Sequence, residues 1–342
     1  PAWPSVSEAA ELPAAVEEEG PVGVEEEEVR PSAGRQSEAG EMASVLKRLS
    51  FGPAGPGKMS EGQKAFKESL SAEAVAFFND VASKPFSQQA VAFLNAYWDE
   101  IGDQADFIFT VAWETMKYAD MHTKGVSLIH LYEEGVELDF NVGLYFYEHL
   151  CKRVLDDPAG KRWRDDPQFS MSMPVMMTAI VRKKELREKV DVNFDGKISF
   201  LEYLLYQYRE VTNPAEFTRR GMANNAKEHP KVRAARLALE DVNDKIRAYE
   251  TEKARLLELS KLDGVKGLTA KHSLTMLVHS PVAEELQVAL IKAEAAVRLA
   301  TKAARAEAMA DYEASGGAQA GALWWMNRDL EEKKRLYGRK SS

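Results

Sequence analysis

The sequence predicts an all-α protein, and three observations support this fold class. After residue 60, apolar residues recur at steps of three and four, which is the spacing of one face of a helix. No run of residues alternates between apolar and polar over the length of an ordinary strand. A loop rich in Asp, Asn and Gly lies between two helical patterns near residue 195, as in a helix–loop–helix motif.

Residues 1–58 are expected to form a disordered, acidic extension that is rich in Pro and Gly. They contain few large apolar side chains, so they cannot bury enough surface to offset the entropy lost on ordering. Residues 1–41 contain eleven acidic side chains and two basic ones, which accounts for the whole chain's net charge of −9. Because residue 1 is Pro, we interpret this part as a fragment or a translated upstream extension, with Met42 and Met59 as alternative starts.

Residues 59–125 are expected to form a helical N-terminal region. Two successive stretches each carry one apolar face, and the breaker Pro85 separates them. The first face comprises Ala74, Val75, Phe77, Phe78 and Val81, and the second comprises Ala90, Phe93, Leu94, Tyr97, Trp98 and Ile101. A third helix is predicted over 106–121.

Residues 126–225 are expected to contain a pair of helix–loop–helix units. The apolar spacing predicts helices over 141–154, 175–190 and 200–209. Between the first two, residues 156–174 carry three prolines and paired acids, so we interpret them as a long linker.

The segment Asp191–Glu202 fits the twelve-residue EF-hand calcium loop at each diagnostic position. Calcium takes six to eight oxygen ligands, and Gly196 permits the sharp turn at position 6. Ile198 at position 8 is the apolar residue expected in a short bridge to a partner loop. The predicted ligands are the side chains of Asp191, Asn193 and Asp195, the backbone carbonyl of Lys197, Ser199 directly or through water, and both carboxylate oxygens of Glu202. A loop with three carboxylates is expected to bind calcium at about 10⁻⁷–10⁻⁵ M.

EF-hands usually occur in pairs, and an upstream companion is found when Leu138 is aligned with Ile198. The companion loop then covers about residues 131–142, with Leu131 at position 1 and Val142 at position 12. Neither side chain has an oxygen to offer calcium. The pair therefore contains one degenerate loop and one calcium loop, and the calcium response is expected to be graded and non-cooperative.

Residues 226–342 are expected to form a bundle of long helices with a coiled-coil-like seam. From Val232 the apolar positions advance by alternate steps of three and four, and Pro230 suits the first turn of a helix that Gly264 and Gly267 would end. A second helix is predicted from Pro281 to about residue 314. A third is predicted over 322–336, with Trp324 and Trp325 as core anchors. This region carries 21 basic and 17 acidic residues, which weakly favours an acidic partner.

No catalytic arrangement is present in the sequence. Residues 52–58 have the spacing of a phosphate-binding loop, but Met59 stands where Ser or Thr would hold magnesium, and Pro53 and Pro56 remove amides that a phosphate needs. The six histidines form no metal-spaced pair, and Cys151 has no neighbouring base. We therefore expect that the chain is not an enzyme.

The single cysteine rules out an internal disulfide and suits the reducing cytosol. No apolar run approaches the roughly 18–20 residues that a membrane span needs. The N-terminus has neither the basic part nor the apolar part of a secretory signal. We expect a cytoplasmic protein with neither a membrane partner nor a nucleic-acid partner.

Four segments of the chain resemble the calcium-regulated actin-bundling proteins of the slime-mould type, an EF-hand-containing family. These segments are residues 84–98, 113–122, 189–196 and 321–334, and the similarity extends over about residues 60–340. It does not include residues 1–58. The resemblance implies a cytoplasmic, cytoskeletal protein of the actin-rich cortex and protrusions that bundles actin filaments and is inhibited by calcium.

The resemblance also implies that the actin contacts lie in about residues 231–340. Actin filaments are acidic, so basic side chains of the predicted helices are the expected contacts: Arg233, Arg236, Lys245, Arg247, Lys253, Arg255, Lys333, Lys334 and Arg335. Bundling requires two actin sites on a monomer, or a weak homodimer. The alternative is a calcium-sensor adaptor that binds a helical partner other than actin.

Overall fold

A computed structural model describes residues 68, 70–126, 132–225, 229–277, 280–310 and 319–338. The chain divides after Lys58 into two units, and all described residues belong to the second unit, Met59–Ser342. The expected acidic extension and Leu131 of the companion loop lie outside the described residues.

Helices dominate the described residues, as the apolar spacing predicted, and the strands found there are two segments of three residues each. The first helices are α3 (Ala72–Ala82), α4 (Phe86–Ala96), α5 (Trp98–Ile101), η2 (Gly102–Gln104), α6 (Ala105–Phe107), η3 (Ile108–Trp113) and α7 (Glu114–Thr123). Ser71 begins α3, because its Oγ accepts a hydrogen bond from the Ala74 amide at 3.2 Å. Pro85 precedes α4 directly, so the predicted break between the first two helices is confirmed.

The middle of the chain contains both strands and several short helices. The elements are β1 (Glu137–Asp139), α8 (Phe140–Cys151), η5 (Lys152–Asp156), η6 (Pro158–Gly160), α9 (Lys161–Arg164), η7 (Pro167–Ser172), α10 (Ala179–Glu185), η8 (Leu186–Val190), β2 (Lys197–Ser199), α11 (Phe200–Gln207) and α12 (Pro214–Asn225). The strands β1 and β2 form an antiparallel pair.

The stretch interpreted as a linker, residues 156–174, folds into short helical turns on the surface of the core. Trp163 anchors it, since this ring is 5% exposed and lies edge-on to Phe107 and Phe169, with centroids 5.4 and 4.7 Å away. The prediction was wrong because prolines and paired acids indicate a linker locally, whereas one buried indole can hold such a segment in place.

The C-terminal part consists of four helices: α13 (Pro230–Ser260), α14 (Val265–Met276), α15 (Pro281–Ala310) and α16 (Ala320–Tyr337). Helix α14 was not predicted, because Gly264 and Gly267 were both interpreted as helix ends. Gly264, with φ of 82°, does separate α13 from α14. Gly267 lies inside α14, where a Cβ atom would come within 1.8 Å of the Leu262 carbonyl oxygen.

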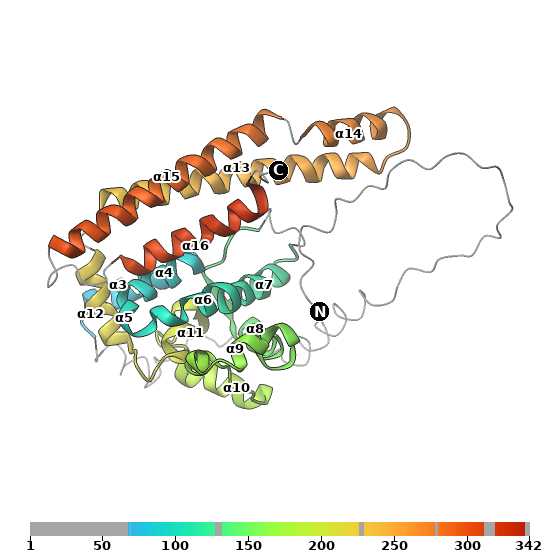
Figure 1. Ribbon diagram of the computed structural model, residues 1–342. Coiled ribbons are helices and arrows are strands. Elements are labelled where there is room, and N and C mark those ends of the chain that lie inside the picture. The colour runs from blue at the N-terminus through green and yellow to red at the C-terminus, as the bar shows by residue number, and fades with distance from the viewer. Residues whose placement is uncertain are drawn as a thin grey trace. The chain divides into compact units, whose positions relative to one another are not determined.

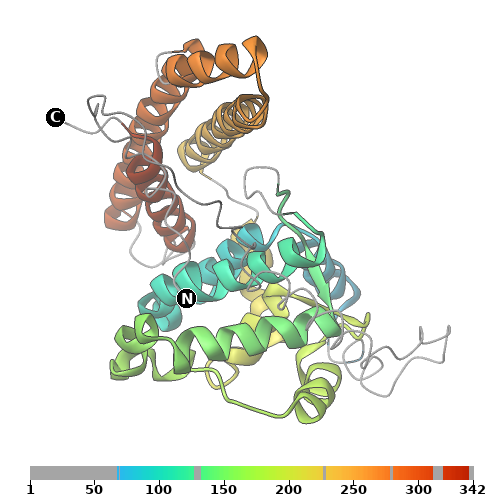
Figure 2. The ribbon, with the colours of Figure 1, turned by 90° about the vertical axis from the view of Figure 1, so that its right-hand side faces the viewer.

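Helices α13 and α15 pack lengthwise, and α16 packs against both (Figure 1). In Figure 2 the orange α14 lies at one end of the α13 and α15 pair. The predicted seam forms the core of this bundle, and Val232, Ala235, Leu239 and Val242 of α13 are buried against α15 and α16. The partners are Leu286, Leu290, Ala293 and Val297 of α15 and Leu323, Met326 and Leu330 of α16.

A separate core, rich in aromatic side chains, holds the N-terminal helices and the loop pair together. Its largest fully buried side chains are Phe78, Phe86, Phe93, Tyr97, Phe107, Phe146, Phe200, Tyr203, Tyr208 and Phe217. These side chains come from helices that precede and follow the predicted calcium loop in the chain. The loop is therefore anchored to a closely packed core. None of the helices in the described part of the chain is long and apolar enough to span a membrane.

Candidate calcium site and its contacts

The candidate calcium loop lies between η8 and α11, and β2 forms its second half. β2 pairs with β1 of the companion loop in the predicted register, with Leu138 opposite Ile198. Both side chains are buried, at 3% and 0% exposure. The short bridge therefore joins the two loops through an apolar contact, as in an EF-hand pair.

Two residues with positive φ make the turn of the loop. Gly196 has φ of 88°, which explains why the pattern needs glycine at this position. Phe194 has φ of 59°, in the left-handed region that a non-glycine residue seldom adopts. The glycine follows from the loop pattern, whereas nothing in the sequence indicates a left-handed conformation at Phe194.

Backbone amides orient the first acidic ligands toward the inside of the loop. The Asp191 carboxylate accepts hydrogen bonds from the amides of Asp195 and Gly196, at 3.1 and 3.0 Å. The Asn193 Oδ1 atom accepts from the Asp195 amide at 3.0 Å, and the Asp195 Oδ1 atom accepts from the Lys197 amide at 2.8 Å. Three of the predicted ligands are thus brought together by the turn itself.

Glu202 closes the loop from the other side. Its Oε2 atom accepts from the amide and the hydroxyl of Ser199, both at 2.9 Å, and the Ser199 Oγ atom accepts in turn from the Glu202 amide. This capping box begins α11. The Oε1 atom accepts from the amides of Val192 and Asn193, at 3.0 and 3.3 Å. Glu202 therefore connects both ends of the loop through protein donors.

The negative charges of the loop carboxylates are only partly balanced by positive charges of the protein. Burial, and then the charge of Asp195, raises the pKa of Asp191 to about 7. Burial likewise raises the pKa of Glu202 to about 8. A nearby cation favours the ionised form of a carboxylate, so a divalent ion suits this buried acidic pair.

The donor set fits calcium in its chemistry, but Glu202 would have to exchange its present hydrogen bonds for the ion. Within the described ranges, no three His, Cys, Asp or Glu side chains converge as a metal site requires. The Lys197 side chain forms an ion pair with Glu137 of β1, so its charge is directed away from the turn.

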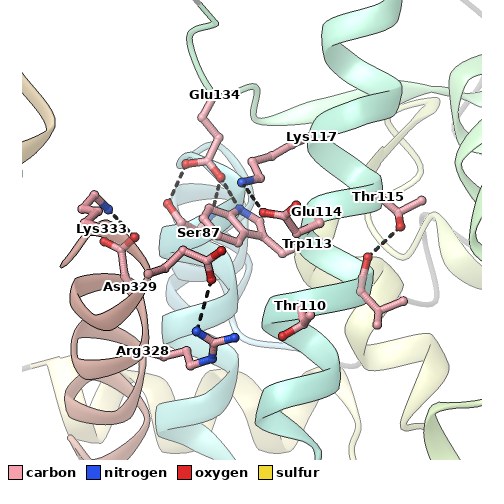
Figure 3. A network of polar contacts seen from close by, with 12 residues as sticks. Ser87, Thr110, Trp113, Glu114, Thr115, Lys117, Glu134, Arg328, Asp329 and Lys333 are labelled. Carbon is pink, nitrogen blue, oxygen red and sulfur yellow. Dashed lines mark hydrogen bonds and ion pairs between the residues drawn. The ribbon is translucent and has the colours of Figure 1, made fainter. Parts of the chain in front are cut away.

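Hydrogen bonds from backbone amides and nearby side chains hold the companion loop in place. Figure 3 shows the Glu134 carboxylate, which accepts from the Ser87 amide at 2.9 Å, from the Ser87 hydroxyl at 2.6 Å and from the Trp113 indole N–H. Asp139 begins α8 by accepting from the amides of Asn141 and Val142, at 2.8 and 3.0 Å. Two of the acidic side chains of this loop, Glu134 and Asp139, therefore have structural partners within the protein.

Gln89 of α4 is a residue that the sequence analysis missed. Its side chain is fully buried, and Nε2 donates to the carbonyl oxygens of Ala82, Lys84 and Val136, at 2.9, 2.6 and 2.7 Å. Its Oε1 atom accepts from the amide of Leu201 at 2.9 Å. One amide group thus joins the companion loop to the first turn of α11, next to Glu202.

Helix α16 contacts the N-terminal helices through its two tryptophans. Trp325 is 5% exposed, and its ring centroid lies 4.9 Å from that of Phe109 and 5.1 Å from that of Trp113. Trp324 is half-buried and lies beside Trp98, with centroids 6.4 Å apart. The tryptophans are therefore packed between helices, as the sequence analysis expected of core anchors.

Polar groups also hold α16 against the N-terminal helices. The Asn95 Oδ1 atom accepts from the Ala322 amide at 2.8 Å, which satisfies an amide in the first turn of α16. Gly321 lies against the backbone of Leu94, where a Cβ atom would come within 2.6 Å of the carbonyl carbon. Arg328 donates to Asp106 at 3.2 Å and to Glu332 at 3.1 Å, and it lies beside the network of Figure 3.

Seven of the nine basic residues expected to contact actin form ion pairs in the structure. These pairs are Arg236–Glu240, Lys245–Glu285, Lys253–Glu250, Arg255–Glu252, Lys333–Asp329, Lys334–Glu294 and Arg335–Glu332. Arg233 and Arg247 are exposed on α13 and form no ion pair with any residue that the structure describes. They lie fourteen residues apart, so they are on nearly the same side of the helix and about 21 Å apart along it.

Comparison with known proteins gives extensive matches to a curated protein and to a solved structure. No protein-family model matches the chain. The curated "Calcium-regulated actin-bundling protein" of Dictyostelium discoideum is 56% identical over 283 residues, which cover 82% of this chain and 94% of that protein. Among solved structures, the 34 kDa F-actin bundling protein of the same organism matches with a TM-score of 0.72 and 57% identity, over 80% of this chain and 100% of that one.

Proposed function

The chain belongs to the family of calcium-regulated actin-bundling proteins, and on this premise we propose that it crosslinks actin filaments into bundles and that calcium inhibits the crosslinking. The observation that carries this proposal is the 56% identity to a protein of that name over most of both chains. A relative of this kind points to a cytoplasmic, cytoskeletal protein and away from an enzyme. It favours bundling over the calcium-sensor adaptor.

The calcium ion would be held by the predicted ligands of the loop. Asp191, Asn193, Asp195 and Ser199 supply side-chain oxygens, Lys197 supplies its carbonyl, and Glu202 supplies its carboxylate. When bound, the ion would supply two positive charges among three carboxylates, two of which are buried. Glu202 would then release the amides of Val192 and Asn193, and this rearrangement would act on α11, because Glu202 lies in its first turn.

We infer that the change reaches the C-terminal helices along packed contacts. Gln89 joins α11 to the companion loop, and Glu134 of that loop accepts a hydrogen bond from Trp113. Trp113 in turn packs on Trp325 of α16. A ligand can only bias states that it binds unequally, so calcium would favour an arrangement of these contacts in which an actin site is covered.

The actin contacts are proposed on α13 and α16. Arg233 and Arg247 are the strongest candidates among the nine basic residues, because forming a contact with actin would not require them to leave an existing ion pair. The proposed partner is filamentous actin, at the actin-rich cortex and in protrusions. The proposed oligomeric state is a monomer with two actin sites or a weak homodimer.

Low-speed cosedimentation with filamentous actin tests the function directly. We expect the chain to pellet filaments without calcium and to leave them in the supernatant when calcium is present. A calcium-sensor adaptor would pellet no filaments under either condition.

Glu202→Gln tests the calcium half of the proposal. Glutamine still forms a capping box, so α11 should remain intact, but the loop loses its bidentate carboxylate. We expect bundling that no longer responds to calcium. Glu148→Gln, an exposed change on α8 outside the loop, serves as the control and should respond as the unmodified chain does. Continued calcium inhibition in Glu202→Gln would refute the assignment.

A further inference from the structure

Four large apolar side chains are exposed within seven residues just before the calcium loop. Val175, Met176, Ile180 and Val181 have exposures of 58%, 57%, 84% and 52%. Isolated exposed apolar residues are ordinary, but a cluster of them is typical of an interaction site. The first two residues lie in an extended segment, 173–178, and the other two lie on α10.

Buried polar contacts hold the extended segment from beneath. The Arg182 guanidinium, which is 5% exposed, donates to the Val175 carbonyl oxygen and to Glu185. Gln207 of α11 donates to the carbonyl oxygens of Met171 and Met173, at 2.8 and 3.2 Å. The backbone is thereby fixed while its apolar side chains are presented outward.

A hollow of about 200 Å³ adjoins this segment. Its lining includes Tyr147, Met171, Met173, Met177, Arg182 and Tyr206. The Tyr147 hydroxyl is buried and has no hydrogen-bond partner among the residues that the structure describes. Buried hydroxyl groups are nearly always hydrogen-bonded, so this one has the capacity to donate to an acceptor that enters the hollow. Methionine side chains adapt to the shape of an inserted group.

The charges around the apolar cluster are mainly basic. Lys184, Arg187 and Lys189 are exposed along the same stretch of chain, and Glu188 is the exposed acid among them. Lys184 lies 4.0 Å from Glu188, at the limit of an ion pair. This surface therefore fits a partner that is acidic and that offers an apolar side chain.

We propose that residues 175–189, named here the α10 surface, form a second contact for the acidic actin filament, distinct from the basic residues of α13 and α16. The inference rests on the proposed function, since one chain that crosslinks filaments needs two contacts. A hollow with an unpartnered hydroxyl favours a protein surface over an anionic membrane, because a bilayer presents no fixed side chain to fill it. The α10 surface continues through η8 directly into Asp191, so the contact lies beside the element that calcium would move.

The double change Ile180→Ser and Val181→Ser tests the α10 surface. Both side chains are exposed, so the fold should be retained. We expect bundling, measured by low-speed cosedimentation without calcium, to fall about fivefold or more, as when anchor side chains leave an interface. High-speed cosedimentation should still detect binding through the C-terminal helices. The control is Val211→Ser with Met222→Ser, which removes apolar side chains that are 41% and 37% exposed elsewhere.

Two further variants test separately the positive charge of the α10 surface and the hydroxyl group that lines the hollow. Lys184→Glu should weaken bundling, whereas Lys161→Glu should not, although each lysine is exposed and lies 4.0 Å from an acid four residues on. Tyr147→Phe removes a hydroxyl that bonds to no group in the described part of the chain, so the unfolding midpoint should stay unchanged. Bundling should nevertheless fall, because the acceptor that enters the hollow then loses its donor.

The outcomes distinguish this inference from the function on which it rests. If the unmodified chain pellets no filaments, the proposed function fails and the α10 surface fails with it. If the unmodified chain bundles and the Ile180 and Val181 variant bundles equally well, only the α10 surface is refuted. If that variant bundles normally but loses binding to phosphatidylserine vesicles, the surface serves a membrane and the inference is overturned.

Discussion

Gln89 connects three segments of the chain through one buried amide. It lies on α4, accepts from the amide of Leu201 in the candidate calcium loop and donates to the carbonyl of Val136 in the companion loop. A buried backbone group that loses its partner costs about 1–3 kcal/mol. A single side chain at this place therefore affects both the stability of the loop pair and the position of α11.

Replacing Gln89 with leucine should lower the free energy of unfolding by about 3 kcal/mol, because several buried backbone groups lose their partners. Urea denaturation measures the change. Gln88→Leu, an exposed change on the same helix, is the control and should stay within about 0.5 kcal/mol of the unmodified chain. If the two variants lose equal free energies of unfolding, the hydrogen bonds of the Gln89 amide make no particular contribution to stability.

At the scale of elements, α16 is the helix through which the two cores meet. Its face with Leu323, Met326 and Leu330 belongs to the C-terminal core. Trp325 belongs to the aromatic contact with Phe109 and Trp113. Because α16 packs against both cores, a shift of the companion loop is transmitted through α16 to α13 and α15.

Trp113→Phe tests this connection. The change keeps an aromatic ring against Trp325 but removes the N–H donor to Glu134. We expect bundling without calcium to persist, while the calcium concentration for half-inhibition rises, because the loop and α16 are less tightly coupled. Trp163→Phe removes a buried indole away from this path and is the control. If both variants shift the calcium midpoint equally, the effect is one of general stability.

For the whole molecule, the distribution of charge governs how the chain meets an acidic filament. Several basic side chains of the C-terminal helices already neutralise acids within this chain, such as Lys245 with Glu285 and Lys334 with Glu294. Exposed pairs of this kind contribute little to stability, but they reduce the charge that the surface presents. Arg233 and Arg247 form no ion pair within the described ranges, so their charges remain available to a partner.

Reversing the charge of Arg233 and Arg247 to Glu should weaken filament binding about tenfold, which corresponds to ~1.4 kcal/mol. High-speed cosedimentation at several salt concentrations measures it, and the difference should shrink as salt screens the charges. The control reverses Arg236 and Arg255, each of which has an acidic neighbour on α13. A stronger effect in the control would place the filament contact on another side of the helix.

The turn of the candidate calcium loop, the bridge between Leu138 and Ile198 and the long seam of α13 could all be predicted. Each depends on residues close together in the chain, whose spacing carries the pattern. The short helices around Trp163 and the whole of α14 could not be predicted. The local composition of these two segments indicates breaks between helices. Packing against side chains that are distant in the chain outweighs this local tendency.

The sequence by itself determined the family, the helical class and the twelve positions of the candidate calcium loop, because an EF-hand places its ligands within one continuous turn. The tertiary structure alone decided how that loop is connected to the rest of the chain. Gln89, Glu134 and Trp113 have no pattern of their own, and the contact between Asn95 and Ala322 joins residues 227 positions apart. Such contacts arise only when folding brings complementary polar and aromatic groups to the same place.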